Sequence, residues 1–314
     1  MAAVGWLDRT VLPQLDQGLR DFYLSISVDS RPDAAPGLLH LTFDNEALAS
    51  TGLPTRVPLS AIQDMLDAAR SSLQTVILDV DLATRSDIEQ VDSFVSYLDG
   101  WSRDPNAPLL VLAYPLYDVP YHDMAAFQRV DAAIANSPNI RWAGVGTFAD
   151  ADGVVRNYEY WSCVDRHGDG NRSALPSVAL YAWARHEMHS AREAVAAVES
   201  AMGMAVTHCN DGTDDTSVSM LDEPLRQSGI IEFQTSLDSL AADGGGRFAP
   251  DGLPRLISVP YCSVSPEGCG SAAGSTNPDQ VAAGRIVLVS AANDFSRDEH
   301  ATPVGYMSGS VILG

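Results

Sequence analysis

The chain has 314 residues, of which 46% are apolar and 19% are charged, a composition typical of a globular protein with a large core. Its formal net charge at pH 7 is −22, and its positive charges all come from arginine, because it contains no lysine. A surface this acidic repels phosphate backbones and anionic lipid head groups, which argues against nucleic-acid binding. No apolar run approaches the roughly 20 residues of a membrane-spanning helix.

Residues 1–30 are predicted to form a separate N-terminal segment. They lack the basic start and the continuous apolar stretch of a signal peptide. Leu7, Val11 and Leu15 recur at helical spacing, so we expect an amphipathic helix that Pro13 interrupts. This helix either packs against its own domain or leads in from a membrane segment outside the sequence.

From residue 31 onward, strand-like and helix-like segments alternate. Apolar runs with the length of buried strands stand at 38–43, 75–78 and 109–113, and a fourth strand-like run stands at 141–148. Helical spacing between them predicts helices at 59–69, with Ser60 as its cap, at 86–97, with Ser86 as its cap, and at 121–135. This alternation predicts a three-layer α/β fold with a central, largely parallel or mixed sheet.

The alternation ends near residue 149, and insertions follow. The predicted elements are a β-hairpin that turns at 149–153, a long helix at 176–198, a surface loop at 207–220, short strands at 230–233 and 256–259, and a last buried strand at 286–289. No internal repeat and no clear linker divides this part of the chain. We therefore treat residues 31–314 as one domain with a hairpin and loop insertions.

Acidic residues follow the predicted strands at their carboxyl ends. Asp44 follows the first strand, Asp79 and Asp81 end the second, and Asp298 follows the last one, close to His300. In a parallel sheet these ends meet at one edge, which is where ligands bind in open α/β folds. Gathered carboxylates raise each other's pKa or require a cation, so a divalent cation or a cationic small molecule would suit them. The competing interpretation is a set of separate, solvated loop acids.

Motifs for known catalytic chemistry are absent or mismatched in the sequence. It has no G-x-S-x-G elbow, no Walker A motif and no G-x-G-x-x-G. The window 148–159 has acids at several EF-hand positions, but Phe148 stands where the first carboxylate is needed, so a hairpin is favoured. A metal-assisted hydrolase built from the strand-end acids and His300 is the alternative function.

The four cysteines are not arranged for zinc, because no two of them form a C-x-x-C pair. Cys262 and Cys269 bracket a short loop rich in Pro and Gly that could bring them together. An even count favours two disulfides, Cys262–Cys269 and Cys163–Cys209, over four free thiols.

Several segments, in order along almost the whole chain, resemble the CHASE2 family of sensor domains. They are Leu19–Tyr23, the strand ending in Phe43-Asp44-Asn45, Arg56 ahead of a helix, Val76–Asp79, the Asp150-Ala151-Asp152-Gly153 turn with Arg156, Leu175–Leu180, and Gly284–Val289 followed by Asp298, Thr302-Pro303 and Gly309. Each segment is short, and their common order makes the match specific.

The resemblance implies a sensor at the periplasmic or extracellular face of the bacterial inner membrane. Such a domain would be held by flanking membrane helices outside this sequence and would pass its signal to a cytoplasmic output, such as a nucleotide cyclase or kinase. The receptor is expected to be a homodimer. The resemblance names no ligand and no catalytic residue. The ligand site is instead expected at the strand-end edge, with Asp44, Asp79, Asp81, Arg156, Asp298 and His300 as candidates. The alternative role of Arg156 is an ion pair with an Asp that buttresses the hairpin.

Overall fold

The computed structural model describes the parts of the chain that build the core of the fold. The described residues are 38–43, 48–49, 57–70, 73–83, 85–114, 124–145, 147–149, 155–165, 172–211, 217–220, 223–226, 228–230, 256–264, 285–291, 299–302 and 305–308. The predicted N-terminal helix lies outside these residues.

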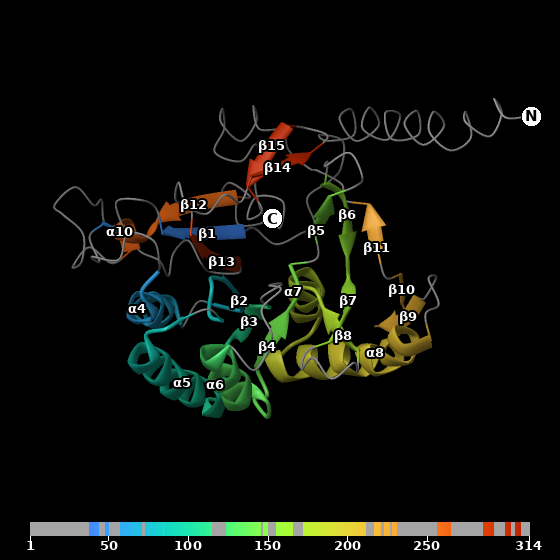
Figure 1. Cartoon of the computed structure of the whole chain (residues 1–314), viewed down its shortest axis with the longest axis horizontal. Helices are drawn as coiled ribbons and strands as arrows, with labels where there is room; N and C mark the ends of the chain where they lie inside the picture. Colours follow the sequence, from blue (N-terminus) through green and yellow to red (C-terminus); the bar gives the residue numbers. More distant parts are fainter. Residues whose placement is uncertain are drawn as a thin grey trace, which may run out of the picture.

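A parallel sheet of six strands forms the centre of the molecule (Figure 1). Its strands are β1 (Leu38–Phe43), β2 (Thr75–Asp79), β3 (Leu109–Ala113), β4 (Ile140–Ala143), β12 (Leu256–Pro260) and β13 (Ile286–Ala291). They are ordered β12-β1-β13-β2-β3-β4, and each neighbouring pair is parallel. The predicted α/β fold is therefore confirmed, with the last strand of the sheet placed between the first two.

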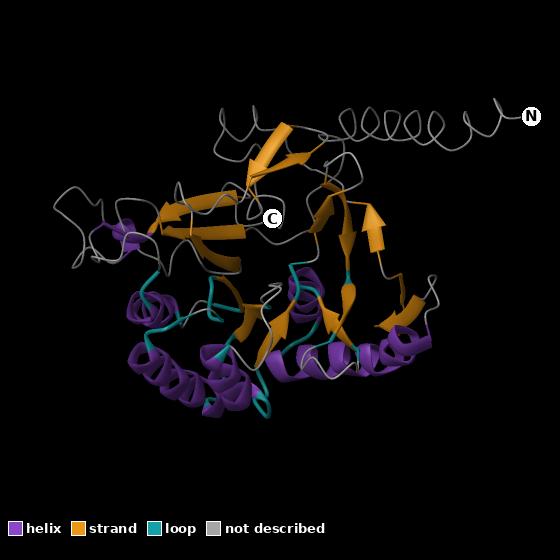
Figure 2. Cartoon of the chain, in the orientation of Figure 1, coloured by secondary structure: helices purple, strands orange, loops and turns teal. Residues whose placement is uncertain are grey.

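Helices cover both faces of this sheet (Figure 2). One face is covered by α4 (Leu59–Ala69), α5 (Ile88–Arg103) and α6 (Ala125–Ile134), together with the short helix α10 (Tyr261–Val264). The other face is covered by α7 (Val178–Glu187) and α8 (Ala191–Asp211). Among the described residues, no helix is both long and apolar enough to cross a membrane.

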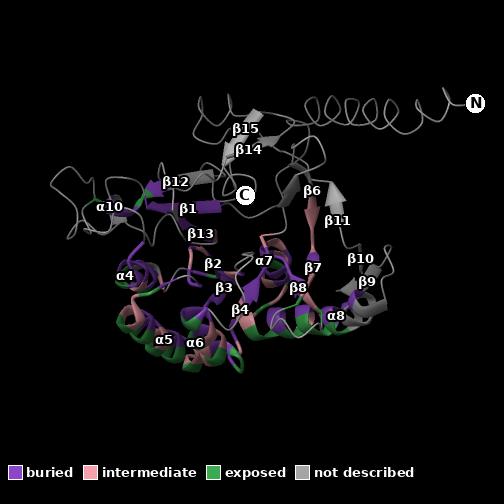
Figure 3. Ribbon diagram, viewed as in Figure 1, coloured by how far each residue is buried: buried purple, intermediate pink, exposed green. Residues whose placement is uncertain are grey.

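The strands are apolar because successive side chains point to opposite faces and both faces are buried. In β3, Leu110 and Leu112 pack towards α4–α6, whereas Leu109 and Val111 pack towards α7 and α8. Buried residues accordingly fill the sheet and the inward sides of the helices, and exposed residues mark their outer sides (Figure 3). This sandwich gives the domain two separate hydrophobic cores.

Small antiparallel pairings lie outside the central sheet. Strands β5 (Thr147–Ala149), β6 (Val155–Glu159) and β11 (Ser228–Ile230) form one sheet, and three two-stranded pairs are formed by β7 (Trp161–Val164) with β8 (Ser173–Pro176), β9 (Ser217–Met220) with β10 (Glu223–Arg226), and β14 (Glu299–Thr302) with β15 (Gly305–Ser308). The antiparallel pairing of β5 with β6 confirms the predicted hairpin arms.

The single long helix predicted at 176–198 is wrong, because the chain forms α7 and α8 with a break between them. Glu193 accepts hydrogen bonds from the backbone N–H groups of His189 and Ser190, at 3.1 and 3.2 Å. The Ser190 hydroxyl accepts in return from the backbone N–H of Glu193 at 3.2 Å. This is a capping box, a start signal for α8 that is visible in the sequence as S-x-x-E.

Several predicted boundaries are also corrected. The strand expected at 141–148 is split into β4 and β5, and the loop expected at 207–220 contains the end of α8 and strand β9. Helix α5 begins at Ile88 rather than at Ser86, and helix α4 has Pro58 at its cap position rather than Ser60; neither helix has a side-chain cap. Proline at this position fits because it has no N–H group that would need a partner.

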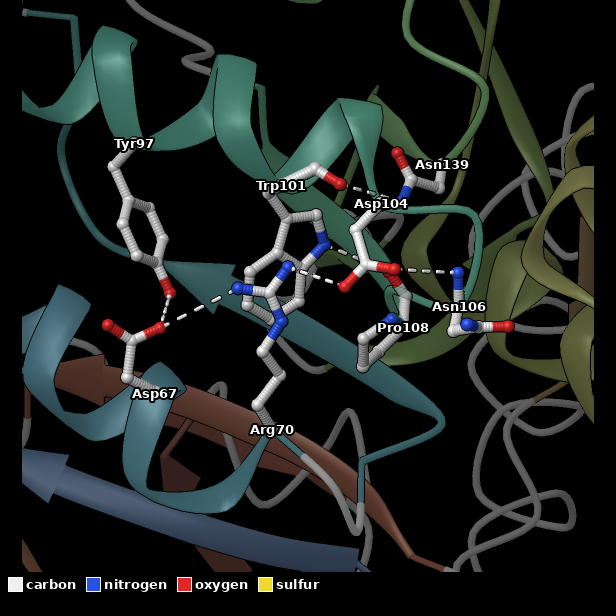
Figure 4. A network of polar contacts seen from close by, with 8 residues as sticks. All are labelled: Asp67, Arg70, Tyr97, Trp101, Asp104, Asn106, Pro108 and Asn139. Atoms are coloured by element: carbon white, nitrogen blue, oxygen red, sulfur yellow. Dashed lines mark hydrogen bonds and ion pairs between the residues drawn. The ribbon is translucent and has the colours of Figure 1, made fainter.

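A polar network joins the C-terminal ends of α4 and α5 (Figure 4). Arg70 donates to Asp104 at 2.9 Å, and its guanidinium carbon lies 4.7 Å from the centre of the buried Trp101 ring. The Tyr97 hydroxyl donates to Asp67 at 2.8 Å. Burial raises the pKa of Tyr97, so the hydroxyl keeps the proton that this hydrogen bond requires.

Candidate functional site

A row of polar side chains crosses the central strands near their carboxyl ends. Thr42 of β1 pairs in register with Ser290 of β13, and Ser290 pairs with Asp79 of β2. Residues in register on parallel strands point to the same face of a sheet. The three polar residues therefore share one face, and this face is opposite to the one on which Leu41 and Val289 pack against α4–α6.

We call Thr42, Ser290, Asp79 and His40 the polar row. His40 lies one step further towards the amino ends of the strands than the other three. It lies two residues before Thr42, so its side chain is on the same face. Its Nε2 atom lies 2.7 Å from the Ser290 hydroxyl, which makes a buried hydrogen bond between residues 250 positions apart in the chain. His40, Thr42 and Ser290 are all less than 8% exposed. A polar group is costly to bury unless it is hydrogen-bonded, and this pair satisfies that requirement.

His40 was not among the residues predicted from the sequence. A histidine within the otherwise apolar run LLHLTF is a visible signal, because few polar residues occur in a strand buried on both faces. Its partner, however, comes from the far end of the chain. Only the placement of β13 beside β1 brings the two side chains together.

Asp81 organises the loop that follows β2. Its carboxylate accepts a hydrogen bond from the backbone N–H of Ala83 at 3.0 Å, and its backbone carbonyl accepts from Arg85 Nε at 2.9 Å. Arg85 also donates to the carbonyl of Val57 at 2.5 Å and lies 3.5 Å from Asp87. Asp81 and Asp79 are both partly exposed. Asp81 therefore has a structural part in this loop in addition to the ligand contact predicted for it.

The other predicted ligand-binding residues are placed only in part. Arg156 belongs to β6 and His300 to β14, and these two strands lie against each other. For Arg156 and His300 the structure describes the backbone and not the side chain. Asp44 and Asp298 lie outside the described residues. The convergence of all six residues on one site therefore stays a prediction.

The polar row does not have the arrangement of a catalytic triad. In a triad the imidazole lies between the serine and the acid. Here β13 lies between β1 and β2, so Ser290 has His40 on one side and Asp79 on the other. No group of three or more His, Cys, Asp or Glu side chains that could hold a metal occurs among the residues described. The polar row consists of side chains that donate or accept hydrogen bonds.

A disulfide joins Cys163 of β7 to Cys209 of α8, with 5.5 Å between the two Cα atoms. This is the pair that the sequence favoured. Cys262 is also disulfide-bonded, and Cys269, its predicted partner, lies outside the described residues. Disulfides persist in oxidising compartments outside the cytoplasm.

Comparison with known proteins identifies the family. The family model described as CHASE2 domain matches residues 1–314, which is the whole chain. No curated protein and no solved structure matches it. The CHASE2 family consists of extracytoplasmic sensory domains. The chain therefore belongs to the CHASE2 domain family.

Proposed function

We propose that the chain is the extracytoplasmic sensory part of a bacterial transmembrane signalling receptor, and that it passes a signal to a cytoplasmic output such as a nucleotide cyclase or kinase. The observation that carries this proposal is the family match over residues 1–314. The disulfide between Cys163 and Cys209 supports it, because such a bond is stable where the receptor's outer part would lie. We expect the receptor to be a homodimer, since two-fold assemblies are the commonest oligomers.

The ligand site that we propose is the strand-end cluster of Asp44, Asp79, Asp81, Arg156, Asp298 and His300. Its support is the polar row of His40, Thr42, Ser290 and Asp79, which makes the carboxyl ends of β1, β13 and β2 polar on one face only. In open α/β sheets this edge is where ligands bind. A divalent cation or a cationic small molecule would complement the carboxylates.

Two reporters, each fused after residue 314 in the receptor gene, test where the domain lies. Alkaline phosphatase becomes active only outside the cytoplasm, so we expect the phosphatase fusion to be active. A green fluorescent protein exported unfolded does not fluoresce there, so we expect the fluorescent-protein fusion to be dark. Cytoplasmic fluorescence would overturn the placement of the domain.

Output activity tests the ligand site separately. We expect Asp79→Asn to change the response of the output to divalent cations or amines. The matched control is Asp99→Asn, because Asp99 is an exposed acid on α5 that pairs with Arg103. Equal responses in the two variants would remove Asp79 from the proposed site.

A further inference from the structure

A cavity lies beside β4, at the edge of the central sheet and away from the strand-end cluster. It has a volume of about 340 Å³, which is at the lower end of the range for small-molecule sites. α6 and α8 cover opposite faces of the sheet and flank β4 (Figure 1). Residues of α6, α8, β4 and β8 line the cavity. We call this cavity the lateral pocket and define it by Asp131, Arg141, Trp142, Tyr181, Glu199, Met202 and Gly203.

The floor of the lateral pocket is largely apolar. Trp142, Tyr181 and Met202 line it, and each is less than 7% exposed. Trp142 packs on Phe127 with 4.8 Å between the ring centres. Its indole N–H donates to Asp131 at 3.1 Å, which fixes the orientation of the ring. This floor suits a ligand with a flat apolar body.

The charged wall already satisfies its own arginine. Arg141 donates from Nε to Glu199 at 2.7 Å, and its Nη2 lies 2.6 Å from the same Glu199 oxygen. Its Nη1 donates to the carbonyls of Ser137 and Ile140. These contacts use four of the five N–H donors of a guanidinium. An anionic ligand would have to displace Glu199 before it could bind Arg141.

The net charge of the wall favours a cation. The lining holds two carboxylates, Asp131 and Glu199, and one guanidinium, that of Arg141, so the pocket carries one net negative charge. Arg141 Nε and Nη2 both approach the Oε1 atom of Glu199. The Glu199 side chain is 54% exposed, so a ligand can reach it from solvent. An ammonium group in the pocket would meet this carboxylate and the aromatic side chains of the floor, which also attract cations.

We propose that the lateral pocket binds a small organic cation, a primary ammonium group on an apolar body. This inference deepens the proposed sensory function. Binding of the cation does not depend on that function; only its role as a signal does. The ligand would bridge α6 and α8, which belong to opposite layers. It would therefore shift any equilibrium in which these helices move relative to the edge strand, by its difference in affinity for the two states.

Three probes of similar shape test the charge preference. They are 2-phenylethylammonium, neutral 2-phenylethanol and anionic 3-phenylpropionate, each titrated into the purified chain by calorimetry. We expect the ammonium probe to bind at least about tenfold more tightly than the anion. In Glu199→Gln the net negative charge is lost, and this preference should fall to about threefold or less.

Gly203 allows the pocket to be filled without disturbing the core. Apart from its chain neighbours and the backbone of its own helix turn, a Cβ atom at Gly203 would meet no atom within 4 Å, and the same holds for Gly100 on α5, outside the pocket. Gly203→Met should abolish binding of the ammonium probe, and the matched control Gly100→Met should retain it. Both variants should fold, because methionine favours helices more than glycine does.

Two results would overturn the proposal. One is that 2-phenylethylammonium does not bind, or that Gly203→Met leaves its binding unchanged. The other is that 3-phenylpropionate binds as tightly as the ammonium probe or more tightly. The proposed sensory role is tested apart from this, in the receptor. Binding in the purified chain with no change in output would leave the pocket standing and contradict its role in signalling.

Discussion

Removal of the Cys163–Cys209 disulfide is expected to lower the stability of the domain by about 3–4 kcal/mol. The two cysteines are 46 positions apart, and closing a loop of this length in the unfolded chain corresponds to about 4 kcal/mol in the chain-entropy model. The closed loop contains β8, α7 and most of α8, which form the layer on one face of the sheet. Such a loss is a large part of the roughly 5–15 kcal/mol of a typical domain.

The perturbation is the double variant Cys163→Ser/Cys209→Ala, because Cys163 is partly exposed and Cys209 is buried. Substitution is preferable to a reductant, since Cys262 is also disulfide-bonded and would be reduced as well. Urea unfolding followed by circular dichroism gives the free energy of unfolding, and the slope should rise because the unfolded chain becomes more expanded. A double variant within about 1 kcal/mol of the wild type would refute the reasoning.

Three further substitutions test contacts outside the disulfide, each by urea unfolding. Trp101→Phe should cost about 2–3 kcal/mol, because the Pro108 carbonyl loses its indole donor at 3.0 Å and the core gains a small void. Arg70→Ala should cost only about 1 kcal/mol, because both side chains of its ion pair with Asp104 are about one third exposed; a loss above about 2 kcal/mol would contradict this assignment. Burial raises the pKa of Tyr158 from 10.0 to about 12. The neutral phenol is therefore favoured in the folded state, so the stability of the wild type should fall between these pH values. Tyr158→Phe should be about 1 kcal/mol less stable than the wild type at neutral pH. Its free energy of unfolding should fall less between pH 10 and about 12 than that of the wild type. An equal fall in both proteins would exclude Tyr158 as its source.

The Tyr158 prediction concerns how the small β5–β6–β11 sheet is joined to the main domain. The Tyr158 hydroxyl accepts a hydrogen bond from the backbone N–H of Ala179, in the first turn of α7, at 3.1 Å. At the same helix end, Ser177 accepts from the N–H of Leu180 at 3.3 Å. Two side chains thus satisfy N–H groups that have no partner within the helix. Through this contact, β6, the strand of Arg156, is attached to the helical layer on the same face of the sheet as the polar row.

The two faces of the sheet differ in a way that bears on sensing. The face against α4–α6 is apolar along every strand of the core, as expected for a surface that only packs. The opposite face carries His40, Thr42, Ser290 and Asp79 towards the strand ends. Buried polar groups depend on their partners for stability. A ligand that changed those partners would therefore act more strongly on this face than on the apolar one.

Local signals in the sequence accounted for the class of fold. Apolar runs of strand length alternate with segments of helical period, and this alternation alone indicates helices on both faces of a parallel sheet. The capping box at Ser190 and Glu193 was also available locally, although the helix-like sequence on both sides of it suggested one continuous helix. The acids at the ends of predicted strands were visible in the same way, as was the even number of cysteines.

The sequence by itself determined that the chain folds as a layered α/β domain, because the period of apolar residues is a local property that each segment carries alone. Only the tertiary structure decided that β13 enters between β1 and β2, and so that Ser290 meets His40 from 250 positions away. It also decided that α6 and α8 face each other across the edge of β4 to form the lateral pocket. Strand order and helix placement arise from packing between distant segments, and no local pattern encodes them.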